Sequence, residues 1–318
     1  AIQLAAAQVI VDAPKGNMYQ AIALLREAAG RDRRNPEIYN ALGDAYRKLY
    51  NGSEAAKAYQ EAIDADKKNV LAYYMTGKIY QTQNNVDVFT EYYNDAIAAD
   101  PKFGPVYYQL YYYYYFKDVN KALDYLQKYI ANTDPDSKND YMLTDLYYVS
   151  QKYNEAIAEA NKIITKEDTA VQPRIYKLLA YSYDGLKDYV HAEENLKKYF
   201  STAKDSNYVA KDFDLMGKIA EKNNREEEAA SWYEKAYQME RDTIQKVEYT
   251  RKLYAFYKKH KDYGKQAFWL EQQYVLHANM TNVDLFNWGI ANYNSQNYSM
   301  ADSVFGMYAN KYPEQTYG

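Results

Sequence analysis

Two segments that lie 34 residues apart decide the fold, Tyr39-Asn40-Ala41-Leu42-Gly43-Asp44-Ala45-Tyr46 and Tyr73-Tyr74-Met75-Thr76-Gly77-Lys78-Ile79-Tyr80. Each segment is followed by a second amphipathic stretch, residues 54–65 and 88–99, and Pro101 closes the second of these. Self-similarity at such a period is typical of repeat proteins, in which a unit buries its apolar face only by stacking on its neighbours. The sequence therefore predicts helical hairpins that stack in series.

The period continues along the chain when each unit is aligned on the residue that opens its second amphipathic stretch. The spacings between successive anchors are 34, 34, 33, 34, 36, 37, 37 and 35 residues. The nine anchors, most of them small, are Ala21, Ala55, Phe89, Ala122, Ala156, Ala192, Ala229, Gln266 and Ala301. Glycine (12) and proline (7) are scarce, which suits long helices with short turns. We therefore expect an all-α protein.

This pattern resembles the tetratricopeptide repeat, whose template is W-x₂-L-G-x₂-Y…A-x₃-F…P over 34 residues. The template glycine has counterparts at Gly43, Gly77, Gly217 and Gly289. The resemblance implies a right-handed superhelical α-solenoid of about nine such hairpins, in a single domain over residues 1–318. The expected repeats span approximately residues 2–35, 36–69, 70–103, 104–136, 137–172, 173–208, 209–245, 246–280 and 281–318.

Packing follows from the same pattern. Small residues at the anchors and at Gly43 or Gly77 let the two helices of a hairpin approach closely. We expect the large side chains of Leu25, Tyr46 and Tyr59 to fill the space between neighbouring hairpins.

Composition excludes several classes of function. The 39 basic and 43 acidic residues give a net charge of −4, so the sequence offers no electrostatic reason to expect nucleic acid as a partner. The chain has no cysteine, which removes disulfides, thiolate metal sites and thiol catalysis. No apolar run approaches the roughly 18 residues of a membrane span. We expect no cofactor and no metal.

Catalytic patterns are missing as well. The three histidines, His191, His260 and His277, are not paired at metal-ligand spacing. The sequence contains no glycine-rich phosphate loop, no G-x-S-x-G and no H-E-x-x-H. We therefore expect that the protein is not an enzyme.

Tyrosine is the unusual residue, with 41 copies, and about half of them occupy packing positions of the repeat template. The resemblance implies that first helices line a concave groove through three positions, which lie one, five and eight residues after the template tryptophan. Many tyrosines without a packing reason fall on these positions. The ligand-binding residues expected there are Tyr74, Lys78, Tyr108, Tyr112, Tyr115, Tyr141, Asp145, Tyr148, Lys177 and Tyr181.

A tyrosine-lined groove with scattered charges suits an extended peptide, because tyrosine offers a rigid amphipathic surface at low entropic cost. Our leading interpretation is a non-enzymatic scaffold that binds a protein or peptide partner. Capture of a glycan by aromatic stacking is the alternative, and a passive assembly component of an envelope complex is a third. Tyrosine could also serve these helices only as a packing residue.

The ends and the location complete the expectations. The first helix is mostly apolar and the tail Glu314-Gln-Thr-Tyr-Gly318 looks like an entry into another repeat. We expect the natural chain to continue beyond Gly318, or these ends to make end-to-end or homo-oligomer contacts. Richness in tyrosine, asparagine and lysine without cysteine resembles exported repeat proteins of Bacteroidetes-type bacteria. This resemblance implies a periplasmic or outer-membrane-attached protein, with the cytoplasm as the alternative, and detection of the native protein only in cytosolic fractions would contradict export.

Overall fold

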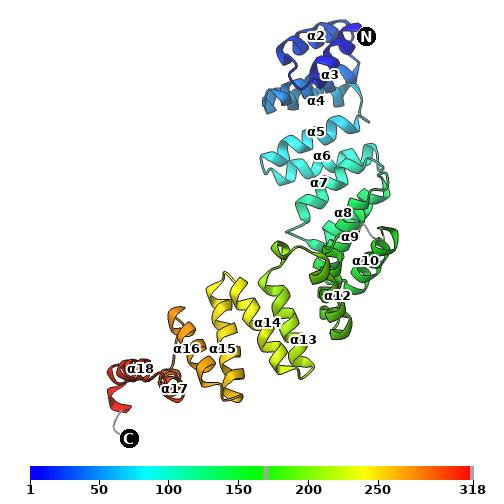
Figure 1. The fold of residues 1–318 in the computed structure, drawn as a ribbon. Helices are drawn as coiled ribbons and strands as arrows, with labels where there is room; N and C mark the ends of the chain where they lie inside the picture. Colours follow the sequence, from blue (N-terminus) through cyan, green and yellow to red (C-terminus); the bar gives the residue numbers. More distant parts are fainter. Residues whose placement is uncertain (168–170, 316–318) are drawn as a thin grey trace. The chain divides into compact units, whose positions relative to one another are not determined.

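The computed structural model describes residues 1–167 and 171–315. These residues form eighteen α-helices and two short 3₁₀ helices, and the described ranges contain no strand. Consecutive helices run as antiparallel hairpins that follow one another in chain order (Figure 1). The all-α fold of hairpins expected from the period is confirmed, while the handedness and the grouping into one domain stay predictions.

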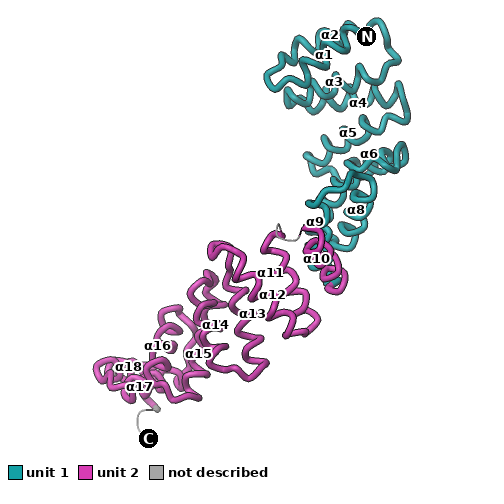
Figure 2. The backbone as a smooth tube through the Cα atoms, turned by 45° about the vertical axis from the view of Figure 1, so that its right-hand side comes forward, with its two compact units in different colours: residues 1–152 teal, residues 153–318 magenta. Residues whose placement is uncertain are grey.

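The chain divides into two compact units, residues 1–152 and 153–318 (Figure 2). The helices of unit 1 are α1 (Ile2–Asp12), α2 (Met18–Arg31), α3 (Pro36–Lys48), α4 (Gly52–Ala65), α5 (Val70–Thr82), α6 (Val86–Ala99), α7 (Gly104–Tyr114), α8 (Val119–Ala131) and α9 (Ser137–Val149). In unit 2 they are α10 (Tyr153–Glu167), α11 (Arg174–Gly185), α12 (Tyr189–Thr202), η2 (Asp205–Asn207), α13 (Ala210–Lys222), α14 (Glu226–Met239), α15 (Thr243–Lys259), α16 (Tyr263–Val275), α17 (Asn282–Asn294), α18 (Tyr298–Lys311) and η3 (Pro313–Gln315).

Short polar side chains start many of these helices. The Asn51 side chain accepts a hydrogen bond from the backbone N–H of Glu54 at the start of α4, and Asn69 does the same for Ala72 at the start of α5. Such caps satisfy backbone donors that have no partner inside the helix. The turn inside a hairpin commonly contains one residue with positive φ, as at Asn84 (54°) and Asn224 (56°). Asparagine tolerates this conformation better than most residues.

All nine anchor positions are buried in the second helices of their hairpins. Alanine at most of them removes the bulk that would hold two helices apart. Phe89 is the exception in size, and its ring packs edge-on against Tyr113 at 4.9 Å and at a tilt against Tyr93 at 5.7 Å. The backbones of α6 and α7 accordingly approach less closely than those of other successive helices in unit 1, with rings filling the space between them.

Glycine and an aromatic ring meet at the centre of several hairpins. A Cβ added to Gly43 would lie 2.4 Å from the ring of Tyr59, and one added to Gly77 would lie 2.5 Å from that of Tyr93. Both rings are fully buried. Tyr59 therefore fills its own hairpin, and the expectation that it lies between hairpins is wrong in this respect. The reason is that the glycine leaves a hole into which the ring fits.

The outer side of α1 is exposed and apolar, with Ile2 85% and Val9 72% exposed. Contact of this end with another chain stays a prediction. Continuation of the chain beyond Gly318 concerns residues that lie outside the described ranges, and it stays a prediction.

An ion pair joins successive hairpins of unit 2. Arg225, at the start of α14, donates from both guanidinium nitrogens to Glu193 of α12, at 3.1 and 2.6 Å. Burial raises the pKa of Glu193, but hydrogen bonds from Arg225 and Lys197 outweigh it and the pKa lies below its ordinary value of 4.5. The carboxylate form is thus favoured by folding.

Glu193→Gln is expected to lower the free energy of unfolding of unit 2 by about 1 kcal/mol at pH 7. Because the folded pKa is the lower one, the stabilisation is complete above the unfolded pKa near 4.5 and is lost as pH falls through the folded value. The difference between the two proteins should therefore shrink below pH 4.5. Urea unfolding followed by circular dichroism at a series of pH values measures it, and a difference independent of pH would contradict the assignment.

Candidate functional site

The lining positions of unit 1 carry side chains with different degrees of burial. On α7, Tyr112 is 67% exposed and Tyr108 37% exposed, whereas Tyr115, which caps the C-terminal end of α7, is half-buried. On α5, Tyr74 and Lys78 are half-buried. We call these five residues of α5 and α7 the aromatic surface. Asp145 and Tyr148 of α9 are also half-buried and have partners within the chain.

The aromatic surface is connected across helices. The Gln109 side chain of α7 donates to the hydroxyl of Tyr74 on α5 at 3.4 Å. The Lys78 ammonium lies 5.5 Å from the centre of the Tyr74 ring, and the Tyr108 ring packs against Tyr129 at 5.2 Å. Tyr74 and Tyr108 are thus held by neighbours on one side and partly open on the other. Tyr112, the most exposed ring of the group, has no ring contact or side-chain hydrogen bond within the described ranges.

Two of the expected lining tyrosines need a correction. Tyr141 is 5% exposed and Tyr181 is 9% exposed, so both are packing residues in the described structure. The expectation placed both at the groove surface because the template assigns these positions to it. Neighbouring side chains cover them instead, and in the case of Tyr181 a polar network explains why.

Lys177 and Tyr181 lie in unit 2, where they hold the buried carboxylate of Asp212. The Tyr181 hydroxyl donates to Asp212 at 2.8 Å, and the Lys177 ammonium lies 2.8 and 2.9 Å from its two oxygens. The backbone N–H of Val209 donates to the same carboxylate at 3.0 Å, at the start of α13. Burial, and next the charge of Asp212, raises the pKa of Tyr199 to about 12. These groups therefore fix the junction of α11 with α13.

Hydroxyls of buried tyrosines hold polar side chains of the first helices in place by hydrogen bonds. Tyr59 donates to the carboxylate of Asp44 at 2.7 Å, and Tyr93 donates to the side-chain oxygen of Gln81 at 2.6 Å. In unit 2 Tyr233 donates to Glu221 at 2.9 Å. The acceptors in all three pairs occupy expected groove positions. This arrangement was not expected from the sequence, although its signal is present: each tyrosine follows a helix-packing glycine by 16 residues, as Gly43 and Tyr59 do.

Burial and neighbouring groups shift the pKa values of two residues at or beside the aromatic surface. Burial, and next the positive charge of Arg47, lowers the pKa of Lys78. Burial, and next the proximity of Tyr115, raises the pKa of Tyr111 to about 12. Lys78 thus has its ammonium beside another cation.

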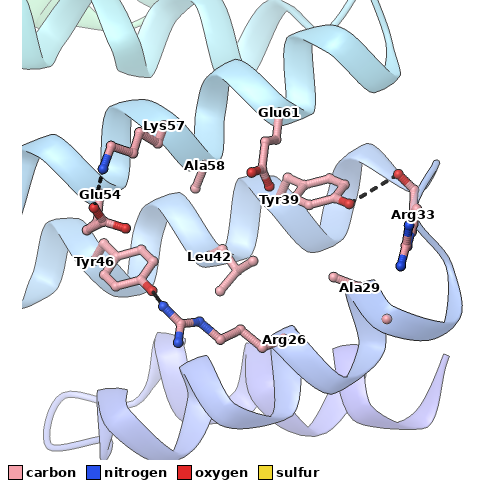
Figure 3. A pocket seen from close by; sticks show the side chains of 11 residues that line it. Arg26, Ala29, Arg33, Tyr39, Leu42, Tyr46, Glu54, Lys57, Ala58 and Glu61 are labelled. Atoms are coloured by element: carbon pink, nitrogen blue, oxygen red, sulfur yellow. Dashed lines mark hydrogen bonds and ion pairs between the residues drawn. The ribbon is translucent and has the colours of Figure 1, made fainter.

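Another hollow, of about 370 Å³, is lined by residues of α2, α3 and α4, among them arginines and glutamates (Figure 3). We call it the mixed-charge hollow. Arg26 donates to the Tyr46 hydroxyl at 2.6 Å, and the Tyr39 hydroxyl donates to the backbone oxygen of Arg33 at 3.1 Å. Glu54 and Glu61 stand opposite these arginines, on α4. The bond between Arg26 and Tyr46 ties the first hairpin to the second, so this hollow has a packing role.

Groups for metal chemistry do not gather in the described structure. His191 Nδ1 lies 2.7 Å from a carboxylate oxygen of Asp188, three residues away on the same helix start. Within residues 1–167 and 171–315, no three His, Asp or Glu side chains come close enough to hold a metal ion. None of the helices in these ranges combines the length and apolar character needed to cross a bilayer.

Comparisons with known proteins find helical repeat proteins of similar fold. Family models described as tetratricopeptide repeat match residues 15–69, 41–102 and 214–243. No curated protein matches the chain. The C-terminal part of a TPR repeat-containing protein from Cytophaga hutchinsonii is 19% identical, with a TM-score of 0.51 over 80% of this chain and 95% of that chain. In the structure of Naa15/Naa10 bound to HypK-THB, a chain that is 11% identical gives a TM-score of 0.62 over 98% of this chain and 51% of that one. A tetratricopeptide repeat protein from Parabacteroides merdae is 20% identical, with a TM-score of 0.43 over 79% of this chain and 97% of that chain.

The fold defines a helical repeat protein built from stacked hairpins. The repeat models match in both units, and the glycine, anchor and aromatic positions of the template have the packing that it requires. Residues 15–102 and 214–243 are therefore identified as tetratricopeptide repeats, and the hairpins of the remaining described residues share their fold.

Proposed function

We propose that this protein is a non-enzymatic scaffold that binds a segment of a partner protein on the aromatic surface of unit 1. The observation that carries the proposal is the exposure of Tyr112, which is 67% accessible on α7 beside Tyr108. Within the described residues this ring makes no ring contact and no side-chain hydrogen bond, so it contributes little to stability. Tyrosine at such a place supplies a large contact area together with a hydroxyl, a combination that is frequent in binding sites.

An extended peptide suits the polar groups beside these rings. The backbone of a bound peptide needs hydrogen-bond partners, since unpaired backbone groups in an interface are costly. The Gln81 side chain on α5 is already held by a hydrogen bond from Tyr93, and that of Asp44 on α3 by one from Tyr59. Side chains fixed in this way lose little entropy when a ligand contacts them. The tetratricopeptide fold, as a scaffold of stacked helices, supports the same interpretation.

Tyr112→Ala is expected to weaken binding of a selected peptide at least tenfold, which corresponds to about 1.4 kcal/mol. The peptide comes from a random library displayed on phage and selected against the whole chain, and its affinity is measured by calorimetry. The unfolding midpoint should stay unchanged, because Tyr112 is not a packing residue. Tyr19→Ala is the matched control, since Tyr19 of α2 is 75% exposed in the same unit and lies outside the aromatic surface.

Tyr80→Ala gives the reverse pattern, because the Tyr80 ring stacks on Tyr92 at 5.7 Å inside its hairpin. It should lower stability more than affinity per folded molecule.

Equal affinities of the Tyr112 and Tyr19 variants would contradict the proposal. An oligosaccharide array probed in parallel separates the glycan alternative, in which Tyr112 contributes to sugar binding and no peptide is selected. A passive assembly role predicts that neither ligand depends on Tyr112. Location in the periplasm or at the outer membrane stays a prediction.

A further inference from the structure

A second hollow in unit 1, of about 520 Å³, lies where α3, α4 and α5 meet. We call it the basic hollow; its chemically distinctive lining residues are Arg47, Tyr50, Ser53, Lys78, Ile79 and Thr82. Arg47 comes from the last turn of α3, Ser53 from the first turn of α4, and Lys78 from the second half of α5. Lys78 also belongs to the aromatic surface, so the two features adjoin each other.

The charged residues that line the basic hollow are all cations. The residues that line the hollow include two cations and no carboxylate, in contrast to the mixed-charge hollow, where Glu54 and Glu61 face the arginines. Arg47 has a partial partner in Asp44, 3.6 Å away on the preceding turn of α3. Lys78 has no carboxylate within ion-pair distance in the described part of the chain, and its ammonium lies 5.5 Å from the centre of the Tyr74 ring. Arg47, Lys78 and Asp44 together leave a net charge of one positive unit.

Tyr50 at the rim is an outlier in its own chain. Its side chain is 97% exposed, and its φ of 57° places a bulky residue in the left-handed region. Equivalent hairpin turns carry polar residues there, such as Asn84, Asn224 and Gln296. At this exposure the Tyr50 ring gains little from packing on its own chain. The positive φ belongs to the turn itself, and a large exposed ring is what distinguishes Tyr50 from the polar residues of the other turns.

We propose that the basic hollow binds the carboxylate of an Asp or Glu side chain in the partner segment, between Arg47 and Lys78, with Tyr50 covering the residue beside it. This inference rests on the proposed function, because the acidic residue belongs to the segment that reaches the aromatic surface. A single carboxylate matches the net charge of one unit, whereas a phosphate dianion would exceed it. Burial, and next the charge of Arg47, lowers the pKa of Lys78 in the free protein, and a bound carboxylate offsets the second of these effects. Ile79 and the Tyr50 ring offer apolar contact, so an acidic residue next to an apolar one fits best.

Random peptides displayed on phage, selected against the whole chain, test the proposal. Peptides that bind wild-type protein should be enriched in Asp or Glu at a fixed distance from an aromatic or aliphatic residue. Arg47→Gln with Lys78→Gln should weaken the best peptide at least tenfold and abolish the enrichment. Arg34→Gln with Lys68→Gln is the matched control, because it removes two exposed cations of unit 1 outside both hollows and should leave affinity within twofold.

A double-mutant cycle between the peptide and the protein tests whether the acidic residue contacts Arg47 and Lys78 directly. Replacing its acidic residue by the amide should weaken binding to wild-type protein about tenfold and change nothing further in the Arg47→Gln, Lys78→Gln protein, because a direct pair is non-additive. Affinity for the wild type should also fall with added salt. Unfolding midpoints of both double variants establish that the hollow remains folded.

The outcomes separate the two proposals. Two results would overturn the carboxylate site and leave the proposed function standing. In the first, the selected peptides depend on Tyr112 but are not enriched in acidic residues. In the second, replacing the acidic residue of the peptide weakens binding equally to the double variant of the hollow and to the control double variant. Peptides that depend on Arg47 and Lys78 but are indifferent to Tyr112 support the carboxylate site and overturn the aromatic surface as the main contact. Failure to select any peptide overturns both.

Discussion

Asp212→Ala is expected to lower the free energy of unfolding of unit 2 by about 3 kcal/mol, more than any other substitution considered for this protein. The carboxylate is fully buried and accepts from three donors, the Lys177 ammonium, the Tyr181 hydroxyl and the backbone N–H of Val209. Its removal leaves a half-buried cation without its counter-charge and a buried hydroxyl without an acceptor. The Lys177 side chain is 27% exposed, so water screens part of the loss and the value should lie at the lower end for buried pairs.

Hydrogen exchange of the amides in α11 and α13, together with urea unfolding, measures this effect, because repeat proteins lose structure locally before they unfold completely. Asp302→Ala on α18 is the control: Asp302 is exposed, and the change should stay within about 0.5 kcal/mol. Tyr181→Phe removes only one hydroxyl and should cost about 1 kcal/mol. Equal stability of the Asp212 and Asp302 variants would show that the buried network contributes nothing.

Gly43→Ala is expected to destabilise unit 1 by about 1–3 kcal/mol, although alanine favours helix by about 1 kcal/mol over glycine. The new Cβ would lie 2.4 Å from the ring of Tyr59. That ring is fully buried, and its hydroxyl is bonded to Asp44 at 2.7 Å, so it has nowhere to move. The two helices of the hairpin must therefore separate.

Gly30→Ala is the matched control in the same unit, because a Cβ at Gly30 of α2 meets no atom within 4 Å. The same substitution should there stabilise the protein by up to about 1 kcal/mol. Thermal unfolding of the two variants beside wild type should therefore give shifts of opposite sign. Stabilisation by both substitutions would mean that helix propensity outweighs packing and that the Gly43 contact is soft.

The close contact at Gly43 was predictable in kind from the sequence, since the repeated spacing of glycines and anchors requires helices that approach closely. The partner was not: Tyr59 was expected between hairpins and lies within its own. The recurring donation from such tyrosines to Asp44, Gln81 and Glu221 was also missed. It depends on how deeply the ring enters the hairpin, which a linear pattern does not specify.

Equivalent positions show where the template stops being informative about the site. Tyr112 and Tyr181 occupy the same place in their repeats, five residues after the template tryptophan position. Tyr112 is 67% exposed, whereas Tyr181 is 9% exposed. The difference comes from the neighbouring first helix, which in unit 2 supplies Asp212 to draw the Tyr181 hydroxyl inward. The period gives the side of the helix, and the adjacent repeat decides whether that side is open.

The sequence by itself determined that this chain is a series of helical hairpins, because every contact that defines a hairpin joins residues close in the chain and recurs at each period. Only the tertiary structure decided which tyrosines are open to a partner and which cations share a hollow. Arg47 and Lys78 are 31 positions apart and belong to different repeats, so no local pattern pairs them. Their proximity depends on how α3, α4 and α5 stack, and stacking is set by the shapes of buried side chains, which sequence periodicity does not encode.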